Sequence, residues 1–360
     1  MNINNRYIFK TLTSYTLTVL LVWLSIYSFF NFLEEINNVG KADYTSFKAM
    51  KYIALNIPDV IHNHATSIIL VGFVLGMGHL SSTNQLVVMR ISGISIFKMT
   101  MLTIKISLFF VFFSIFIGEI LAPWSNQYAE KQRSYALGIS SISSNQDGFW
   151  IKDGEKFINV KQNLDGKLFL DVTIFEVDPS SIIKTVTKAE NAEFDGNNLQ
   201  INNANIYKID NLKSIDNIAT ENIQKLSKPV SFDQDLIEDL KKSPEDLTTW
   251  KIIKQINYLS DNNLRSDFFE IELYKRLIKP FTLIAMILIG MLFVFGSNRS
   301  ATLGRQIFFG VAIALAFEMF ARLSNAFAIG FDVNLILIIT LPTLIVMLIS
   351  FGILSRKSIQ

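Results

Sequence analysis

Residues 11–33 contain no charged side chain, and this limits the possible folds more than any other feature of the chain. A helix of this length rises about 35 Å, enough to cross the roughly 30 Å hydrocarbon core of a bilayer. A second charge-free stretch covers residues 333–355. Shorter stretches reach full length where a polar residue at one end extends to the head groups. These are residues 65–78, 106–118, 281–298 and 307–317. Six membrane-spanning helices are therefore predicted.

Between the third and fourth predicted spans the chain changes character. Residues 123–275 carry 18 basic and 24 acidic side chains, a net charge of −6, whereas the rest of the chain carries 15 and 7, a net charge of +8. So long a polar stretch, set between apolar segments, indicates a folded domain outside the bilayer. We therefore expect an α-helical membrane protein with one large soluble insert between helices 3 and 4.

The basic residues outside the insert predict its orientation. By the positive-inside rule, short loops rich in Lys and Arg face the cytoplasm. Such residues occur before span one, between spans two and three, between spans four and five, and after span six. They are Arg6 and Lys10, Arg90 and Lys98, Arg299 and Arg305, and Arg356 and Lys357. Both termini are therefore expected inside, and the insert outside.

The insert carries the signals of antiparallel β structure. Asp153-Gly154 separates two apolar runs and predicts a hairpin, because both central turn residues need positive φ. Residues 168–175 alternate with a period of two, so the even-numbered and odd-numbered side chains should lie on opposite faces of a strand, one of them buried. Further strands are expected at 182–187 and 199–207. The pattern predicts an antiparallel sheet or sandwich.

The remainder of the insert is read as a loop followed by helices. Residues 208–230 are polar and poorly patterned, and we expect a loop there. Ser243 followed by Pro244 and two acids is typical of a helix start, and this helix should run to about Leu259. A second helix should begin at Ser266 and continue directly into span four.

Several kinds of chemistry have no support in the sequence. There is no cysteine, which excludes thiol and disulfide chemistry. No Walker loop and no Gly-x-Ser-x-Gly motif occurs, so the chain is not expected to hydrolyse nucleotide itself. His62 and His64 make a poor metal site, because residues i and i+2 do not share a helix face. We expect no catalytic residue, no metal and no cofactor.

Charged residues inside predicted spans are functional candidates, because charge in hydrocarbon is costly. Glu318 and Arg322 are four residues apart in span five, share a helix face and can neutralise each other. A structural ion pair, facing the bundle or the outer interface, is the simpler interpretation, and substrate contact or gating is the alternative. Lys105 and Glu119, near opposite ends of span three, are explained by snorkelling.

The loop between spans two and three holds a short apolar segment. Residues 82–92 can form two or three helical turns, with Ser82 or Thr83 as N-cap and Gly93 as terminator. Its apolar surface has nothing in so short a loop to cover it, so it should lie in the lipid interface or dock into a groove on a cytoplasmic partner. With a single charge the segment favours a partner. The docking residues are predicted to be Gln85, Leu86, Val87, Val88, Met89, Arg90 and Gly93.

The segment Gln85–Gly93 (QLVVMRISG) resembles the coupling helix of the LptF/LptG family, the transmembrane subunits that export lipopolysaccharide. The similarity covers essentially the whole chain. It is carried by Arg6-Tyr7-Ile8, Gly118–Pro123, Gly148–Gly154 and Tyr274-x-Arg276-x-x-x-Pro280. Two of these stretches, GFWIKDG and LVVM, are more similar to the LptG branch than to the LptF branch.

The resemblance implies a half-transporter in the inner membrane of a Gram-negative bacterium. Residues 1–122 would hold spans one to three with the coupling helix, 123–265 a periplasmic jelly-roll-like β domain with a helical return, and 266–360 spans four to six. It implies an LptF-type permease, an LptB-type ATPase dimer and an LptC-type bitopic protein as partners. Lipopolysaccharide would enter a cavity between the two permeases.

Two departures from the family pattern affect the expected sites. Gln85 stands where relatives commonly have Glu, so an ion pair to the ATPase would become a neutral hydrogen bond. The lysines that relatives carry at the outer end of span one are missing, which leaves Arg133, Lys131 and Lys41 as the cations expected to bind lipid A phosphates. The alternatives are the LptF paralogue or, with less support, an integral-membrane enzyme acting on lipids or glycans.

Overall fold

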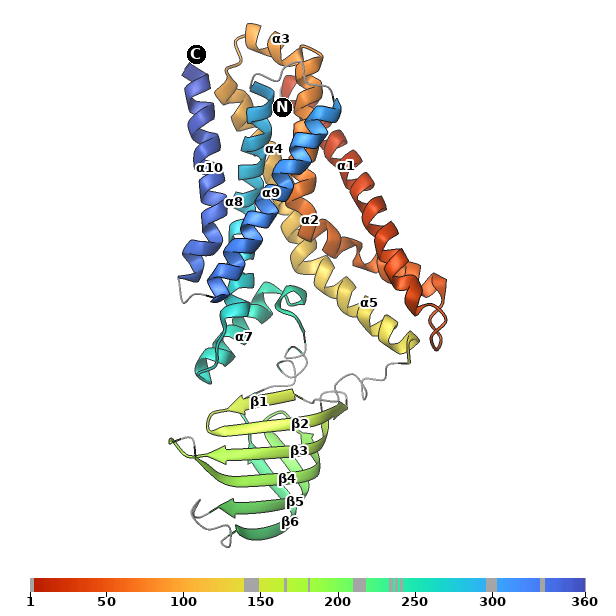
Figure 1. Ribbon diagram of the computed structural model, residues 1–360, viewed down its shortest axis with the longest axis vertical. Helices are drawn as coiled ribbons and strands as arrows, with labels where there is room; N and C mark the ends of the chain where they lie inside the picture. Colours follow the sequence, from red (N-terminus) through yellow and green to blue (C-terminus); the bar gives the residue numbers. More distant parts are fainter. Residues whose placement is uncertain are drawn as a thin grey trace. The chain divides into compact units, whose positions relative to one another are not determined.

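The computed structural model describes residues 3–138, 149–164, 167–180, 182–209, 218–232, 236, 239, 242–295, 303–330 and 334–359 (Figure 1). The chain forms two compact units. The membrane unit comprises Met1–Val39, Thr45–Glu130 and Asp267–Gln360, and the insert unit comprises Gly40–Tyr44 and Lys131–Ser266.

Long helices make up the membrane unit. They are α1 (Ile3–Glu35), α2 (Ser46–Ser82), α4 (Ile96–Phe116), the π-helical turn η2 (Ile117–Leu121), α5 (Ala122–Ala136), α8 (Asp267–Phe295), α9 (Leu303–Gly330) and α10 (Leu335–Ile359), with the short α3 (Gln85–Ile91) between α2 and α4. Among the described residues, five helices are long and apolar enough to cross a bilayer: α1, α2, the continuous α4–η2–α5, α9 and α10. The predicted fourth span lies on α8, and the last residues of that span fall outside the described ones, so the count of six stays a prediction.

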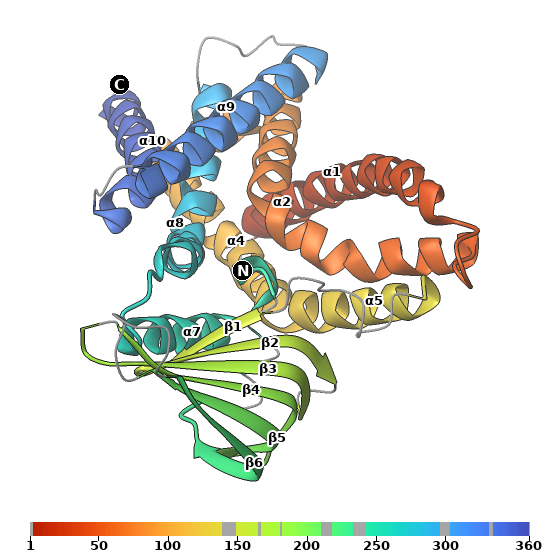
Figure 2. The ribbon, with the colours of Figure 1, turned by 60° about the horizontal axis from the view of Figure 1, so that its bottom comes forward.

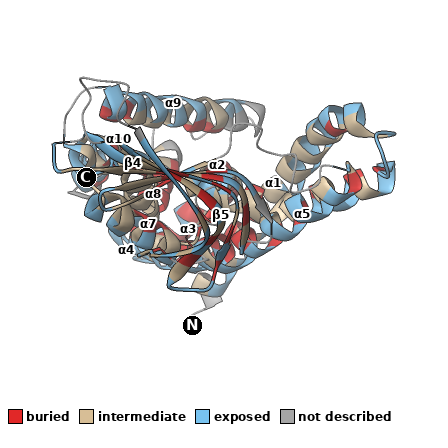
Figure 3. Cartoon of the chain, turned by 90° about the horizontal axis from the view of Figure 1, so that it is seen from below, coloured by how far each residue is buried: buried red, intermediate tan, exposed pale blue. Residues whose placement is uncertain are grey.

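Helix α2 is the centre of this unit, since most of its apolar stretch is buried while α1 and α9 are largely exposed (Figure 3). Phe73, Met77 and Leu80 of α2 belong to a core shared with α1, α4, α8 and α10. Gly72 lets α1 approach closely, because a Cβ at this position would lie 2.6 Å from Thr16 Cα. Small residues at such crossings are typical of membrane helix pairs.

Six antiparallel strands form the insert sheet, in the same order as in the sequence (Figure 1). They are β1 (Phe149–Asp153), β2 (Lys156–Leu164), β3 (Leu168–Val177), β4 (Ile183–Phe194), β5 (Asn198–Ile209) and β6 (Ile218–Pro229). The predicted β-rich insert is confirmed, and its described strands form a single curved sheet (Figure 2). The hairpin predicted at Asp153-Gly154 is confirmed, but its turn residues are Gly154 and Glu155, and of these only Gly154 has positive φ, at +59°.

The alternation of buried and exposed side chains shifts by one residue in the middle of strand β3. On β3 both Phe169 and Val172 are buried, although a strict period of two would place them on opposite faces. Between them Asp171 adopts a left-handed conformation, φ +50°, and Asn203 does the same on β5 at φ +53°. Both lie level with Glu190 of the intervening β4. The predicted alternation through 168–175 was therefore wrong, because one left-handed residue shifts the pattern by one position.

Two other expectations for the insert need correction. Part of the predicted loop 208–230 is β6, an exposed edge strand. Its main chain pairs with β5 along its length, and because neither face is deeply buried, its side chains show no apolar alternation. The helix expected from Ser243 is a single 3₁₀ turn, Pro244–Asp246, and α7 (Thr249–Asp261) begins only after Thr248, whose hydroxyl accepts from the Lys251 amide. The helix that enters the fourth predicted span, α8, begins at Asp267, one residue after the predicted start at Ser266.

Helix α7 is tied to the first hairpin of the sheet. The Tyr258 hydroxyl donates to the Lys152 carbonyl over 2.9 Å and accepts from the Lys152 amide over 3.2 Å. Burial raises the pKa of the Tyr258 hydroxyl, so it remains a hydrogen-bond donor at pH values at which an exposed tyrosine begins to ionise. Asn262 accepts from the Gly154 amide over 2.9 Å. These contacts position α7 within the insert unit.

Candidate functional site

Helix α3 is a short, sharply bounded element. Its N-cap is Asn84, at φ +59°, rather than Ser82 or Thr83, because α2 extends to Ser82 and the Thr83 hydroxyl bonds back to the His79 carbonyl over 2.8 Å. Gly93 follows its end at φ +85° and donates to the Arg90 carbonyl, so its predicted role as terminator is confirmed. The chain therefore presents α3 as a separate short helix between α2 and α4.

The two faces of α3 differ from the prediction. Leu86 and Met89 were predicted to contact a partner. They are instead 4% and 8% exposed and pack into the chain's own helical core. The outward apolar residues are Val88 and Ile91, 61% and 82% exposed, with Val87 partly covered. The helical period decides this division, because α2 already occupies one side of α3.

Gln85 stands at the edge of these two faces. Its side-chain oxygen Oε1 is buried and has no hydrogen-bond partner among the described residues. Arg90 is exposed at the other end of the helix. An unpaired buried carbonyl costs free energy, while the rest of the half-buried Gln85 side chain stays accessible to a partner.

Glu318 and Arg322 form the predicted ion pair on α9, with 3.0 Å between Arg322 Nε and Glu318 Oε1. Their side chains are 49% and 75% exposed, so the pair does not face the interior of the bundle. Exposed apolar side chains surround it along the same helix, Leu315, Met319 and Leu323. A charged pair is therefore presented on the outside of an apolar helix.

Residues of two neighbouring helices extend this face. The ring of His64 on α2 lies 5.4 Å from that of Trp23 and 5.8 Å from that of Tyr27, both on α1. Ala314 of α9, one turn before Glu318, packs against Leu70 and Val74 of α2. Sequence reasoning treated His64 as an unremarkable interfacial residue, since neighbours on other helices leave no local signal. We call Trp23, Tyr27, His64, Glu318 and Arg322 the α1–α2–α9 face.

The predicted phosphate-binding cations lie in the insert unit. Lys131 and Arg133 are in the last turns of α5. Lys41 is in the turn 40–44, which the structure brings to the end of α5 through a 3.0 Å bond from the Asp43 amide to the Ala136 carbonyl. Lys41 and Lys131 are exposed and Arg133 is half-buried. The fold thus brings segments about 90 positions apart to one end of the same helix.

The family model described as "Lipopolysaccharide export system permease LptF/LptG" matches residues 6–356. The chain belongs to this family. Similar relatives are the proteins named "Lipopolysaccharide export system permease protein LptG" of Haemophilus influenzae, 26% identical over 99% of both chains, and of Escherichia coli strain K12, 24% identical over 98% of both. The family membership and the membrane-protein class expected from the motifs are confirmed.

In this LptF/LptG family member, two stretches that carried the resemblance meet in space. Glu119, in the π-helical turn η2, pairs with Arg276 of α8 at 3.5 Å between Oε1 and Nη1, and Arg276 also holds Glu272 at 3.1 Å. The Arg276 side chain is only 10% exposed. Snorkelling was therefore the wrong explanation for Glu119, which is held by a cation on another helix.

The two histidines of His62-Asn63-His64 turn to different partners. His62 Nδ1 lies 2.9 Å from the Ser114 carbonyl on α4, and its ring packs where Gly118 has no side chain, since a Cβ there would lie 2.0 Å from Nδ1. His64 faces α1, as described above. Among the described residues no group of three potential metal ligands occurs.

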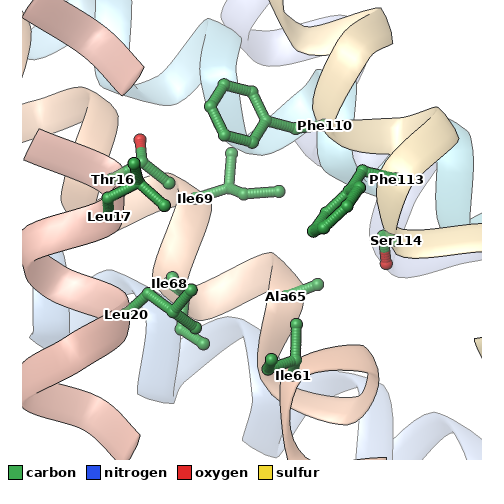
Figure 4. A pocket seen from close by; sticks show the side chains of 10 residues that line it. All are labelled: Thr16, Leu17, Leu20, Ile61, Ala65, Ile68, Ile69, Phe110, Phe113 and Ser114. Atoms are coloured by element: carbon green, nitrogen blue, oxygen red, sulfur yellow. The ribbon is translucent and has the colours of Figure 1, made fainter. Parts of the chain in front are cut away.

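A small apolar pocket of about 60 Å³ lies between α1, α2 and α4 (Figure 4). Leu17 and Leu20 line it from α1, Ala65 from α2, and Phe110 and Phe113 from α4. Nothing charged reaches it, so it has no means of recognising a head group.

Proposed function

We propose that this chain is the LptG-type permease subunit of a lipopolysaccharide exporter in the inner membrane. An LptF-type permease would be its transmembrane partner, and a separate LptB-type ATPase dimer would drive the cycle. The family match over almost the whole length and relatives named LptG support this assignment. The LptF paralogue is the alternative within the same complex.

The observation that carries the proposal is the charged pair on the α1–α2–α9 face. Ionised side chains in a membrane span face a partner or a water-filled space rather than acyl chains, because charge in hydrocarbon is costly. Glu318 and Arg322 are both exposed in this chain, so their cover comes from outside it. We assign this face to a cavity shared with the second permease, through which the amphiphilic substrate passes.

The exporter also needs a surface that binds the ATPase, and we assign this role to α3. Val88 and Ile91 form an apolar patch on a helix whose other side is fixed in the core, so force on the patch passes directly to α2 and α4. We propose that this end of the bundle and both termini lie in the cytoplasm, in line with the positive-inside pattern. An LptC-type bitopic helix would pack on α1, whose Leu17, Leu21 and Phe29 are exposed.

Photo-crosslinking can test the substrate path. A benzophenone amino acid would replace Met319, 65% exposed on α9, or Phe112, 71% exposed on α4, as a matched control. We expect lipopolysaccharide to crosslink at position 319 when the subunit is assembled with its partners and substrate, and much less at 112. Equal crosslinking at both positions would contradict a path along α9.

The cations of the insert unit provide a second test. Arg133→Glu with Lys131→Glu should weaken capture of lipopolysaccharide, because phosphate loses a bidentate donor and gains repulsion. Binding of the ATPase should be unchanged, and Lys184→Glu with Lys225→Glu, two exposed lysines of the sheet, serves as a charge-matched control. If capture in the double variant matches that in the control, phosphate recognition lies on the other permease.

A further inference from the structure

Two helices of the membrane unit are far longer than a bilayer requires. Helix α2 has 37 residues, and α4, η2 and α5 form one continuous helix of 41 residues. At about 1.5 Å per residue they rise roughly 55 and 60 Å, against about 30 Å of hydrocarbon. Their charge-free stretches lie toward the α3 end, at 65–78 and 106–118. The excess is therefore at the other end, in the first turns of α2 and in α5.

These two ends pack together and turn away from the bundle (Figures 1 and 2). Pro58 lies inside α2 where such a turn is expected, because proline removes a helix hydrogen bond and kinks the axis. The Tyr52 hydroxyl donates to Glu130 over 2.6 Å, and the Ser125 hydroxyl donates to the Leu55 carbonyl. We call residues 46–57 and 122–130 the two-helix arm.

The outward side of this arm combines aromatic, aliphatic and cationic groups. Trp124 and Tyr128 stack with ring centroids 6.1 Å apart, and Lys51 Nζ lies 5.5 Å from the centre of the Tyr128 ring. Phe47 is one turn from Lys51 and 77% exposed, Met50 is 61% exposed and Trp124 is 66% exposed. Large apolar side chains this exposed are disfavoured in water, while a lysine and the charged Glu130 are disfavoured in hydrocarbon.

We infer that the two-helix arm lies in the phospholipid head-group layer, on the membrane face opposite to α3. Tryptophan and tyrosine concentrate at this depth because their rings are apolar and their N–H and O–H groups stay hydrated. Phe47 and Met50 reach the upper acyl chains, and Lys51 lies at the level of the lipid phosphates, which attract it. The arm thereby fixes the depth and tilt of α2 and α4 against the bilayer surface.

The four tryptophans of the chain allow this to be measured against internal standards. Three variants each keep one tryptophan, with the other three changed to Phe, and are placed in phosphatidylcholine–phosphatidylglycerol nanodiscs. Trp23 lies in the middle of α1, and because the subunit is reconstituted without the second permease, acyl chains cover the α1–α2–α9 face around it. Trp250 on α7 is 75% exposed. Spin-labelled lipids carrying the label near the head group or deep in the acyl chain, and aqueous iodide, are the quenchers.

We expect Trp23 to be quenched mainly by the deep label and Trp250 mainly by iodide. Trp124 should be quenched most by the head-group label. A Trp124 that follows Trp250 would show that the arm stands in water or against a protein, and one that follows Trp23 would show that it is immersed in the acyl chains. Either result overturns the inference and leaves the proposed transport function untouched.

A charge reversal gives an independent readout. Lys51→Glu should reduce the head-group quenching of Trp124 in nanodiscs rich in phosphatidylglycerol, since one basic residue near an anionic surface changes partition by roughly fivefold. Lys225→Glu on β6 is the control and should leave the quenching unchanged. Equal head-group quenching of Trp124 in both variants would contradict the placement of Lys51 at the lipid phosphates.

Discussion

Two substitutions in α3 distinguish a role in docking from a role in folding: Ile91→Asp tests docking, and Leu86→Asp tests folding. Both are apolar residues of the same short helix, yet Ile91 is 82% exposed and Leu86 is 4% exposed. Leu86 packs in the core that joins α3 to the long helices, whereas Ile91 has no cover from the described part of its own chain. The same substitution should therefore fail in two different ways.

The sizes follow from burial. Truncating a buried leucine costs about 2–5 kcal/mol. Placing a carboxyl group in that space without a hydrogen bond adds roughly 1–3 kcal/mol. Leu86→Asp should therefore destabilise the subunit by at least about 3 kcal/mol. Ile91→Asp should change its own stability by no more than about 0.5 kcal/mol. If an ATPase groove buries Ile91, losing that contact costs about 1.5–3 kcal/mol, a loss of roughly 10- to 100-fold in affinity.

The assay pairs thermal unfolding of the purified subunit in detergent with titration of the ATPase. Ile91→Asp should keep the wild-type Tm and lose ATPase binding. Leu86→Asp should lower the Tm of the subunit alone, without the ATPase present. Val87→Asp, at a partly covered position, should fall between the two. Wild-type ATPase affinity in Ile91→Asp would refute the docking role of α3, and a wild-type Tm in Leu86→Asp would refute the burial argument.

Three further predictions follow from the packing. Gln85→Glu should retain ATPase binding, measured by co-purification, because glutamate keeps the shape of the half-buried side chain and its acceptor oxygen. Loss of the complex would mean that docking requires the neutral amide. Gly118→Ala should lower the Tm by the equivalent of about 1–3 kcal/mol, since its methyl group would overlap His62, whereas Gly352→Ala, with no atom within 4 Å, should not; equal Tm values would contradict the close contact. At Asp171, Gly should be tolerated and Ala should cost about 1 kcal/mol of unfolding free energy, because φ is positive there; the reverse order would exclude the left-handed conformation.

Local sequence features predicted much of the architecture. Charge-free stretches located the membrane helices, because bilayer thickness imposes a minimum apolar length on any helix that crosses it. The Asp-Gly pair located the first hairpin, because a tight turn between two strands needs a residue that accepts positive φ, and Gly154 supplies it. Strand β6 was missed since an exposed edge strand is held by main-chain bonds to its neighbour, which any residue except proline can make.

The family motif also came from the sequence alone, because QLVVMRISG is contiguous. Which side of that helix is available to a partner depended on the core of long helices, which buries Leu86 and leaves Ile91 outside. The partner of Glu119 could not be predicted either, since Arg276 lies far along the chain and reaches it only through the packing of α8. A residue type and its spacing are local properties, whereas burial and pairing depend on the elements that fold against it. The sequence therefore determined what this chain resembles and where it crosses the membrane, and the tertiary structure decided which of its side chains face outward.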